Sequence, residues 1–136
     1  MIGIVVVAHQ DLGEAFVRAA EGVVGPMPRV AWVGLRYDET TEQARERLAR
    51  AIAGVDSGDG VLVLTDMFGG TPTNLSLPFL RAGRVEVLAG VNLPILLKAH
   101  GARDEMDLAS LASFLRDYGQ RNIVLASDIW NARPGE

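Results

Sequence analysis

The stretch GVLVLTDMFGGTPTN, residues 60–74, decides the fold of this chain. Its first part, residues 61–65, is a short apolar run that predicts a strand, and the glycines at 69 and 70 then permit a tight turn. Pro72 suits the first turn of a helix, because the N–H that it lacks is not needed there. The stretch therefore predicts a strand, a glycine-containing loop and a helix that continues to about Leu80.

The same alternation of strand and helix runs along the whole chain. Residues 2–8 are an almost unbroken β-branched run, and a strand that is apolar on both faces belongs in the middle of a covered parallel sheet. Strands are predicted at 2–8, 30–35, 61–65, 85–89 and 123–126, and helices at about 12–24, 41–53, 71–80, 94–99 and 107–118. We therefore predict the α/β class, with a doubly wound, mainly parallel sheet and helices on both faces.

The composition of the chain limits the classes of function that it could have. The 136 residues fit one domain, 1–136, with a tail from about residue 127. The 17 acidic and 13 basic side chains give a net charge of −4, and without a basic run this argues against a nucleic-acid partner. The absence of cysteine excludes disulfides, thiolate metal sites and a cysteine nucleophile. Neither a membrane span nor a signal peptide is predicted, so a cytoplasmic protein is expected.

Two titratable side chains are expected at one edge of the sheet. Ligands of open α/β sheets bind beyond the carboxyl ends of the strands, and His9 and Asp66 each follow a predicted strand directly. If the strand order is 2-1-3-4, these two side chains face each other. A carboxylate that accepts from Nδ1–H leaves Nε2 of the imidazole free as a nucleophile. The alternative for His9 is a polar loop residue or a backbone cap, although its position at the end of a strand favours a functional role. Asp66 alone is explained equally well as a helix cap or a turn residue. His100, near a predicted helix end, is given no catalytic role.

The loop after the third strand has the features of an anion site. Gly69 and Gly70 allow close backbone approach by a ligand, Thr71 suits an N-cap, and Pro72 suits the first helical position. The alternative is an ordinary capped helix. No lysine follows and the glycine spacing is not that of a dinucleotide fingerprint, so a phosphoryl group fits this loop better than a nucleotide.

The remaining candidates have two interpretations each. Met67 and Phe68, an apolar pair beside the proposed site, either dock a partner protein or pack within the loop. Asn92 either lines the crevice or belongs to a turn. Arg36 and Arg45 are interpreted as solvated surface charges.

Three segments together carry a resemblance to a known family. They are IVVVAHQDLGEAF at 4–16, GVLVLTDMFGGTPTN at 60–74 and VEVLAGVNLPIL at 85–96. In order and spacing, up to about Leu115, the chain resembles the mannose-family enzyme IIA component of the bacterial phosphoenolpyruvate-dependent sugar phosphotransferase system. The combination of the three segments is specific, although each segment alone is a weak signal.

This resemblance implies a fold and a set of roles. The sheet order is 2-1-3-4, and the last strand can be exchanged between the subunits of a homodimer. His9 accepts a phosphoryl group from the phosphocarrier HPr and passes it to a IIB component, while Asp66 holds the imidazole. Thr71 contacts the phosphate together with the neighbouring amides of Gly69 and Gly70. The family uses neither a metal nor a nucleotide as a cofactor.

The chain departs from the family in two respects, and three other functions stay open. Gln10 stands where glycine or serine commonly follows the histidine, and no linked IIB domain is present, so IIB is expected to be a separate chain. The first alternative is a stand-alone regulatory relay, in which phosphorylation of His9 controls a partner without sugar transport. The second is a dihydroxyacetone kinase subunit, whose motif after the third strand fits less well. The third is an anion-binding domain without chemistry.

Overall fold

A parallel sheet of four strands forms the centre of the computed structural model, which describes residues 1–132. The order is β2-β1-β3-β4, and all three neighbouring pairs are parallel, which confirms the predicted class and strand order. The strands are β1 (Gly3–His9), β2 (Val30–Leu35), β3 (Val61–Thr65) and β4 (Val85–Ala89).

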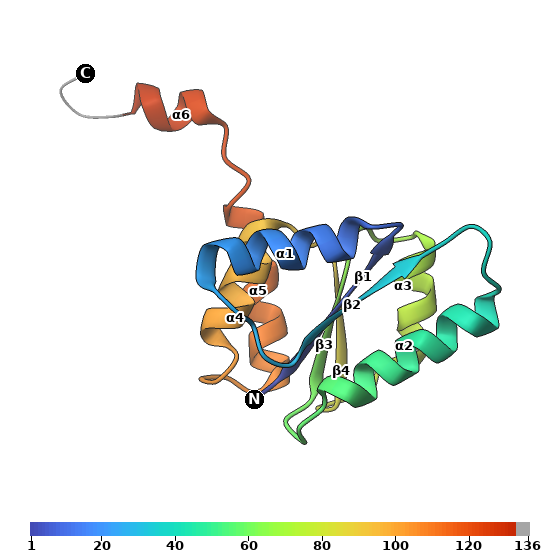
Figure 1. Ribbon diagram of the computed structural model, residues 1–136. Helices are drawn as coiled ribbons and strands as arrows, with labels where there is room; N and C mark the ends of the chain where they lie inside the picture. Colours follow the sequence, from blue (N-terminus) through green and yellow to red (C-terminus); the bar gives the residue numbers. More distant parts are fainter. Residues whose placement is uncertain (133–136) are drawn as a thin grey trace.

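Helices cover both faces of this sheet, so the molecule has three layers (Figure 1). One face carries α1 (Leu12–Val24), α4 (Leu93–Ala102) and α5 (Leu108–Arg121). The other carries α2 (Thr41–Val55), α3 (Thr71–Ser76) and the 3-10 helix η1 (Leu77–Phe79). Among residues 1–132, none of these helices has the length and apolar character needed to cross a bilayer.

The two hydrophobic cores of the protein lie on opposite faces of the sheet, and β1 contributes side chains to both. Ile4 and Val6 point into the core beneath α1, α4 and α5, whereas Val5 and Val7 point into the core beneath α2. All four side chains are fully buried. Since successive side chains of a strand lie on opposite faces, the unbroken β-branched run is what a central strand between two helical layers requires.

The loops that begin the helices follow local capping signals. Thr40 and Gln43 form a reciprocal capping box at the start of α2, with Gln43 N–H donating to Thr40 Oγ1 at 3.1 Å. Asp11 precedes α1 but makes no capping bond with its side chain. Its carboxylate instead accepts from Arg36 at 2.8 Å, which ties the start of α1 to the end of β2.

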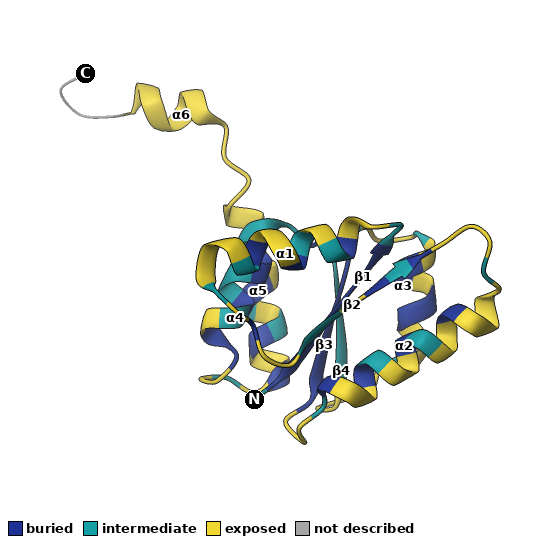
Figure 2. Cartoon of the chain, in the orientation of Figure 1, coloured by how far each residue is buried: buried dark blue, intermediate teal, exposed yellow. Residues whose placement is uncertain are grey.

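The predicted strand at 123–126 is not formed in the single chain. Residues 123–125 have no regular structure, and a short helix α6 (Ala126–Asn131) follows and projects away from the sheet (Figure 1). The segment is exposed along its length (Figure 2), and its apolar side chains include Ile123, Leu125 and Trp130. A strand needs a neighbour for its backbone N–H and C=O groups, and this segment has none within the described chain. Residues 133–136 of the predicted tail lie outside the described residues.

Candidate active site

The strand order brings His9 and Asp66 together at the carboxyl edge of the sheet. His9 is the last residue of β1, Asp66 directly follows β3, and β1 and β3 are hydrogen-bonded neighbours. In parallel strands the carboxyl ends lie at the same edge, so two residues 57 positions apart in the sequence become neighbours. The juxtaposition predicted from the order 2-1-3-4 is therefore present.

A single carboxylate oxygen binds both the ring and the main chain of the histidine. Asp66 Oδ2 lies 2.7 Å from His9 Nδ1 and accepts from the His9 backbone N–H at 3.0 Å. The Asp66 side chain is only 10% exposed, whereas the His9 side chain is 40% exposed. The carboxylate thus fixes the imidazole from the inside, while the ring stays accessible to another molecule.

The electrostatics keep this carboxyl group ionised at neutral pH. Burial by itself raises the pKa of Asp66, but the hydrogen bonds from the His9 backbone and ring outweigh it and hold the pKa below the ordinary value of 3.8. Because an ionised carboxylate can only accept, the proton of the contact must be on Nδ1 of His9. This leaves Nε2 of the neutral imidazole with a free lone pair.

Gln10 holds an unusual backbone conformation directly after the histidine. Its φ angle is +51°, in the left-handed region that favours glycine, so this departure from the family pattern falls on a position with a physical preference for glycine. The Gln10 N–H donates to Leu35 O at 2.9 Å. The Gln10 carbonyl packs so closely on Gly34 that a Cβ at residue 34 would lie 2.2 Å from its oxygen. The sequence analysis did not identify this close contact.

The glycine loop reaches the histidine ring at Gly70. A Cβ placed on Gly70 would lie 3.4 Å from His9 Cε1 and 3.2 Å from Met67 Cγ, so the main chain runs directly beside the ring. Gly69 has a φ of +86°, as its predicted turn requires. The loop therefore brings backbone close to the nucleophile candidate.

The predicted N-cap of α3 was wrong by one residue. Gly70, not Thr71, is the N-cap of α3, because its extended backbone ends the loop and its carbonyl accepts from Asn74 N–H at 3.0 Å. Thr71 is the first helical residue and Pro72 the second. Thr71 is exposed and lines a hollow of about 230 Å³ with Arg45 and Asn74.

Met67 and Phe68 lie at the surface, with exposed fractions of 53% and 76%. Two threonines that flank the loop, Thr65 and Thr73, are by contrast buried and hydrogen-bonded to each other. The sequence analysis assigned no role to either threonine. The signal available in the sequence was the presence of a polar residue within each of two buried segments.

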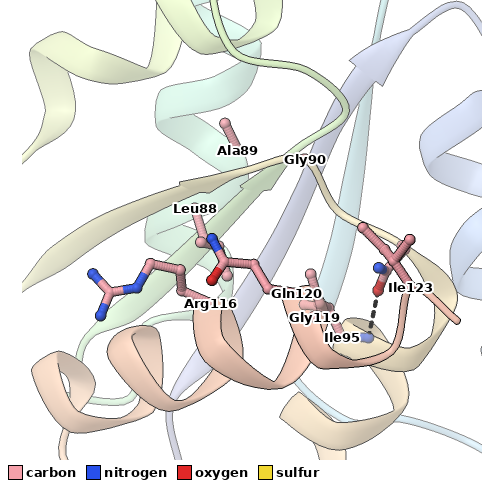
Figure 3. A pocket seen from close by; sticks show the side chains of 9 residues that line it. Leu88, Ala89, Gly90, Ile95, Arg116, Gly119, Gln120 and Ile123 are labelled. Atoms are coloured by element: carbon pink, nitrogen blue, oxygen red, sulfur yellow. Dashed lines mark hydrogen bonds between the residues drawn. The ribbon is translucent and has the colours of Figure 1, made fainter.

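A separate pocket lies at the carboxyl end of β4. It measures about 110 Å³ and is lined by residues of β4, α4 and α5, including Gly90, Ile95, Arg116 and Gln120 (Figure 3). Asn92 lines it as well, but its side chain caps α4 by accepting from Ile95 N–H at 2.9 Å, which is the bond drawn in Figure 3. Neither His9 nor Asp66 lines this pocket.

The other charged candidates have local partners. Arg36 pairs with Asp11, and Arg45 pairs with Glu42 at 3.0 Å, as expected for surface charges. Among the described residues, no group of three or more histidine, aspartate or glutamate side chains is placed to hold a metal ion.

Comparison with known proteins identifies the family. The EIIA-man family model, described as PTS system fructose IIA component, matches residues 3–115. The chain belongs to this family. It is thus a IIA component of the sugar phosphotransferase system. The members of this family are phosphotransferases.

Individual relatives agree with this assignment. The chain is 29% identical over 129 residues to the fructose-specific EIIA component of Bacillus subtilis, covering 94% of this chain and 88% of that protein. It is 34% identical over 105 residues to the mannose-specific EIIAB component of Escherichia coli, covering 76% of this chain but only 32% of that protein. The crystal structure of a phosphotransferase EIIA component from Streptococcus agalactiae superimposes with a TM-score of 0.85 at 26% identity, covering 94% of this chain and 99% of that one.

Proposed function

We propose that this IIA component carries a phosphoryl group on His9, which it accepts from phospho-HPr and passes to a IIB protein during sugar uptake in the cytoplasm. The observation that carries the proposal is the contact between His9 Nδ1 and Asp66 Oδ2 at 2.7 Å. This contact supplies what a histidine nucleophile needs, namely a fixed ring and a defined tautomer.

The chemical step follows from that tautomer. The Nε2 lone pair attacks phosphorus, an N–P bond forms, and the bond between phosphorus and the donor breaks, so that the electron pair of that bond leaves with the donor. The imidazole becomes positively charged while the N–P bond forms. Asp66 stabilises this charge through the Nδ1–H hydrogen bond, and its own low pKa keeps the proton on the ring.

The loop is proposed to bind the transferring phosphoryl oxygens. Phosphoryl transfer depends mainly on positioning and on stabilisation of the equatorial oxygens. The backbone amides of Gly69, Gly70 and Thr71 are the proposed donors, with the Thr71 hydroxyl as a further one. The absence of a Cβ at Gly70 supports this role, because a Cβ there would lie 3.4 Å from His9 Cε1 and take up space beside the ring.

Met67 and Phe68 are proposed to contact HPr and IIB in turn. Both side chains are exposed, and they belong to the loop that carries Asp66 and Gly70. Apolar and aromatic side chains at the centre of an interface exclude water from it. A partner that buries them would bring its own phosphoryl-bearing group to His9.

We also propose that the protein is a homodimer that exchanges its C-terminal segment. The apolar side chains of 123–130 are exposed in the single chain, and β4 is an edge strand whose one neighbouring strand among residues 1–132 is β3. A second copy would cover the segment and give it the strand neighbour that it lacks.

Sedimentation should give twice the mass of the chain. Leu125→Asp should shift it towards monomer, whereas Val23→Asp, at an equally exposed position on α1, should not. A monomeric wild type would contradict this.

Phosphoryl labelling tests the main proposal. Incubation with labelled phosphoenolpyruvate, enzyme I and HPr should add one acid-labile phosphate per chain. His9→Ala should abolish the label, while His100→Ala, which removes the other histidine, should keep it. An unlabelled wild type, or a labelled His9→Ala variant, would show that His9 is not the acceptor.

A further inference from the structure

Two buried hydroxyl groups connect the end of β3 to the loop formed by residues 66–70. Thr65, the last residue of β3, and Thr73, in α3, are both essentially inaccessible to solvent. Their Oγ1 atoms lie 2.6 Å apart, and Thr73 Oγ1 lies 2.6 Å from the carbonyl oxygen of Met67. The three groups form one continuous chain of hydrogen bonds.

The direction of this chain is determined. A carbonyl oxygen can only accept, so the single hydroxyl proton of Thr73 must go to Met67 O. Thr73 then has only lone pairs to offer, and Thr65 must donate to it. The backbone carbonyl of Thr65 is also held, by the N–H groups of Gly90 at 3.0 Å and Val91 at 2.9 Å. Thr65 is thus fixed through both its main chain and its side chain.

The loop held by these bonds contains the parts that surround His9. Asp66 is joined to Thr65, and a Cβ added at Gly70 would lie 3.2 Å from Met67 Cγ and 3.4 Å from His9 Cε1. Between them, Met67, Phe68 and Gly69 are exposed, and Gly69 has high conformational freedom. Such a segment has few packing contacts of its own, so a hydrogen bond to its central carbonyl removes much of its freedom.

We propose that Thr65 and Thr73 are positioning residues for phosphoryl transfer. The chain of hydrogen bonds from Thr65 through Thr73 to Met67 O holds Asp66 and Gly70 in position around His9. The inference rests on the proposed function of His9, which it deepens. Both hydroxyls lie beneath the loop, away from solvent, so they act through the loop and not on the phosphoryl group.

Valine and serine variants separate the hydroxyl from the shape of the side chain. Thr73→Val keeps the branched shape but leaves Met67 O and the Thr65 hydroxyl without a partner in the interior. Thr73→Ser restores the hydroxyl. Ser76→Ala is the matched control, because Ser76 is also buried in α3, and its hydroxyl donates to Pro72 O at 2.6 Å instead of to the loop.

Two measurements are made on each variant at a temperature at which circular dichroism shows it folded. The first is the initial rate of labelling by phospho-HPr as a function of HPr concentration. Thr73→Val should lower the maximal rate roughly tenfold to hundredfold, with little change in the half-saturating concentration, because misplacement of the site by about 1 Å has effects of this size. Thr73→Ser should stay within about threefold of wild type, and Ser76→Ala should match wild type.

The second measurement is the nitrogen chemical shifts of the His9 ring by nuclear magnetic resonance, which report the tautomer without any partner protein. Wild type should have its proton on Nδ1, and Thr73→Val should move towards a mixture of tautomers. If the wild type is never labelled, the proposed function fails while this measurement still tests the positioning role. A wild-type rate and tautomer in Thr73→Val, or an equal loss in Ser76→Ala, would overturn the inference.

Discussion

Replacement of Asp66 by asparagine tests the electrostatic core of the site. Asparagine has nearly the same shape, and its side-chain oxygen, placed where Asp66 Oδ2 lies, can still accept both hydrogen bonds from His9. What disappears is the negative charge beside the ring. The variant therefore separates the charge of the carboxylate from its role as a spacer in the fold.

The size of the effect follows from the contact. Two unit charges about 4 Å apart interact by roughly 4 kcal/mol at an effective dielectric constant of about 20. His9 is 40% exposed, so solvent screens part of this energy. A hydrogen bond to a charged group contributes about 1.5–3 kcal/mol, and at about 1.4 kcal/mol per factor of ten this corresponds to a loss of about 10- to 150-fold in rate. An amide N–H2 turned towards Nδ1 would favour the wrong tautomer and add to the loss.

Single-turnover labelling by phospho-HPr in a rapid-quench instrument measures this rate. Asp66→Asn should lower the maximal rate and leave the half-saturating HPr concentration nearly unchanged, because the Asp66 side chain is only 10% exposed. Asp117→Asn serves as the control, since it removes an exposed carboxylate on α5 that pairs with Arg116. A wild-type rate in Asp66→Asn, or an equal loss in Asp117→Asn, would refute the proposed role of the charge.

Three further outcomes are expected. The folded-state pKa of Asp66 is lowered, so its contribution to stability is present above pH 4 and is lost as the pH falls through that pKa; acid titrations of unfolding for wild type and Asp66→Asn should converge there. Gly34→Ala should lower the free energy of unfolding by about 1–3 kcal/mol, because the added Cβ would push against the Gln10 carbonyl. Gly22→Ala should raise the free energy of unfolding by about 0.5–1 kcal/mol, because a Cβ there meets no neighbouring atom. Urea denaturation measures both changes. Thr40→Ala should cost about 1 kcal/mol in the same assay by removing the capping box, with the labelling rate unchanged.

The strands could be predicted because their patterns are continuous in the sequence. Residues 2–8 and 61–65 are apolar on both faces, and burial on both faces is a property of the central strands of this architecture. Once these two strands are neighbours, the meeting of His9 and Asp66 follows from topology alone. That these two residues are neighbours was therefore predictable, although the distances between their atoms were not.

Other features depend on contacts that no local pattern contains. The N-cap of α3 is Gly70 and not the predicted Thr71, because the conformation of the loop, and not the residue type alone, decides where the first helical bond forms. The side chain of Asp11, the N-cap residue of α1, makes no capping bond and instead pairs with Arg36, which is distant in sequence. The residues 123–126 have the composition of a strand but find no pairing partner within the described chain. In each case a tertiary contact, or its absence, overrode a correct local preference.

The way Asp66 binds His9 bears on how one site can serve two partners in turn. Because the same oxygen accepts from the ring and from the histidine's own backbone N–H, the ring is fixed relative to the end of β1. Turning the ring would break a charge-assisted hydrogen bond in a mostly buried setting, which is costly. On the proposed function, donor and acceptor proteins therefore meet an imidazole whose direction is already set, and neither has to supply that alignment. Recognition can then rest on the exposed pair Met67 and Phe68, which is separate from the atoms that carry the charge.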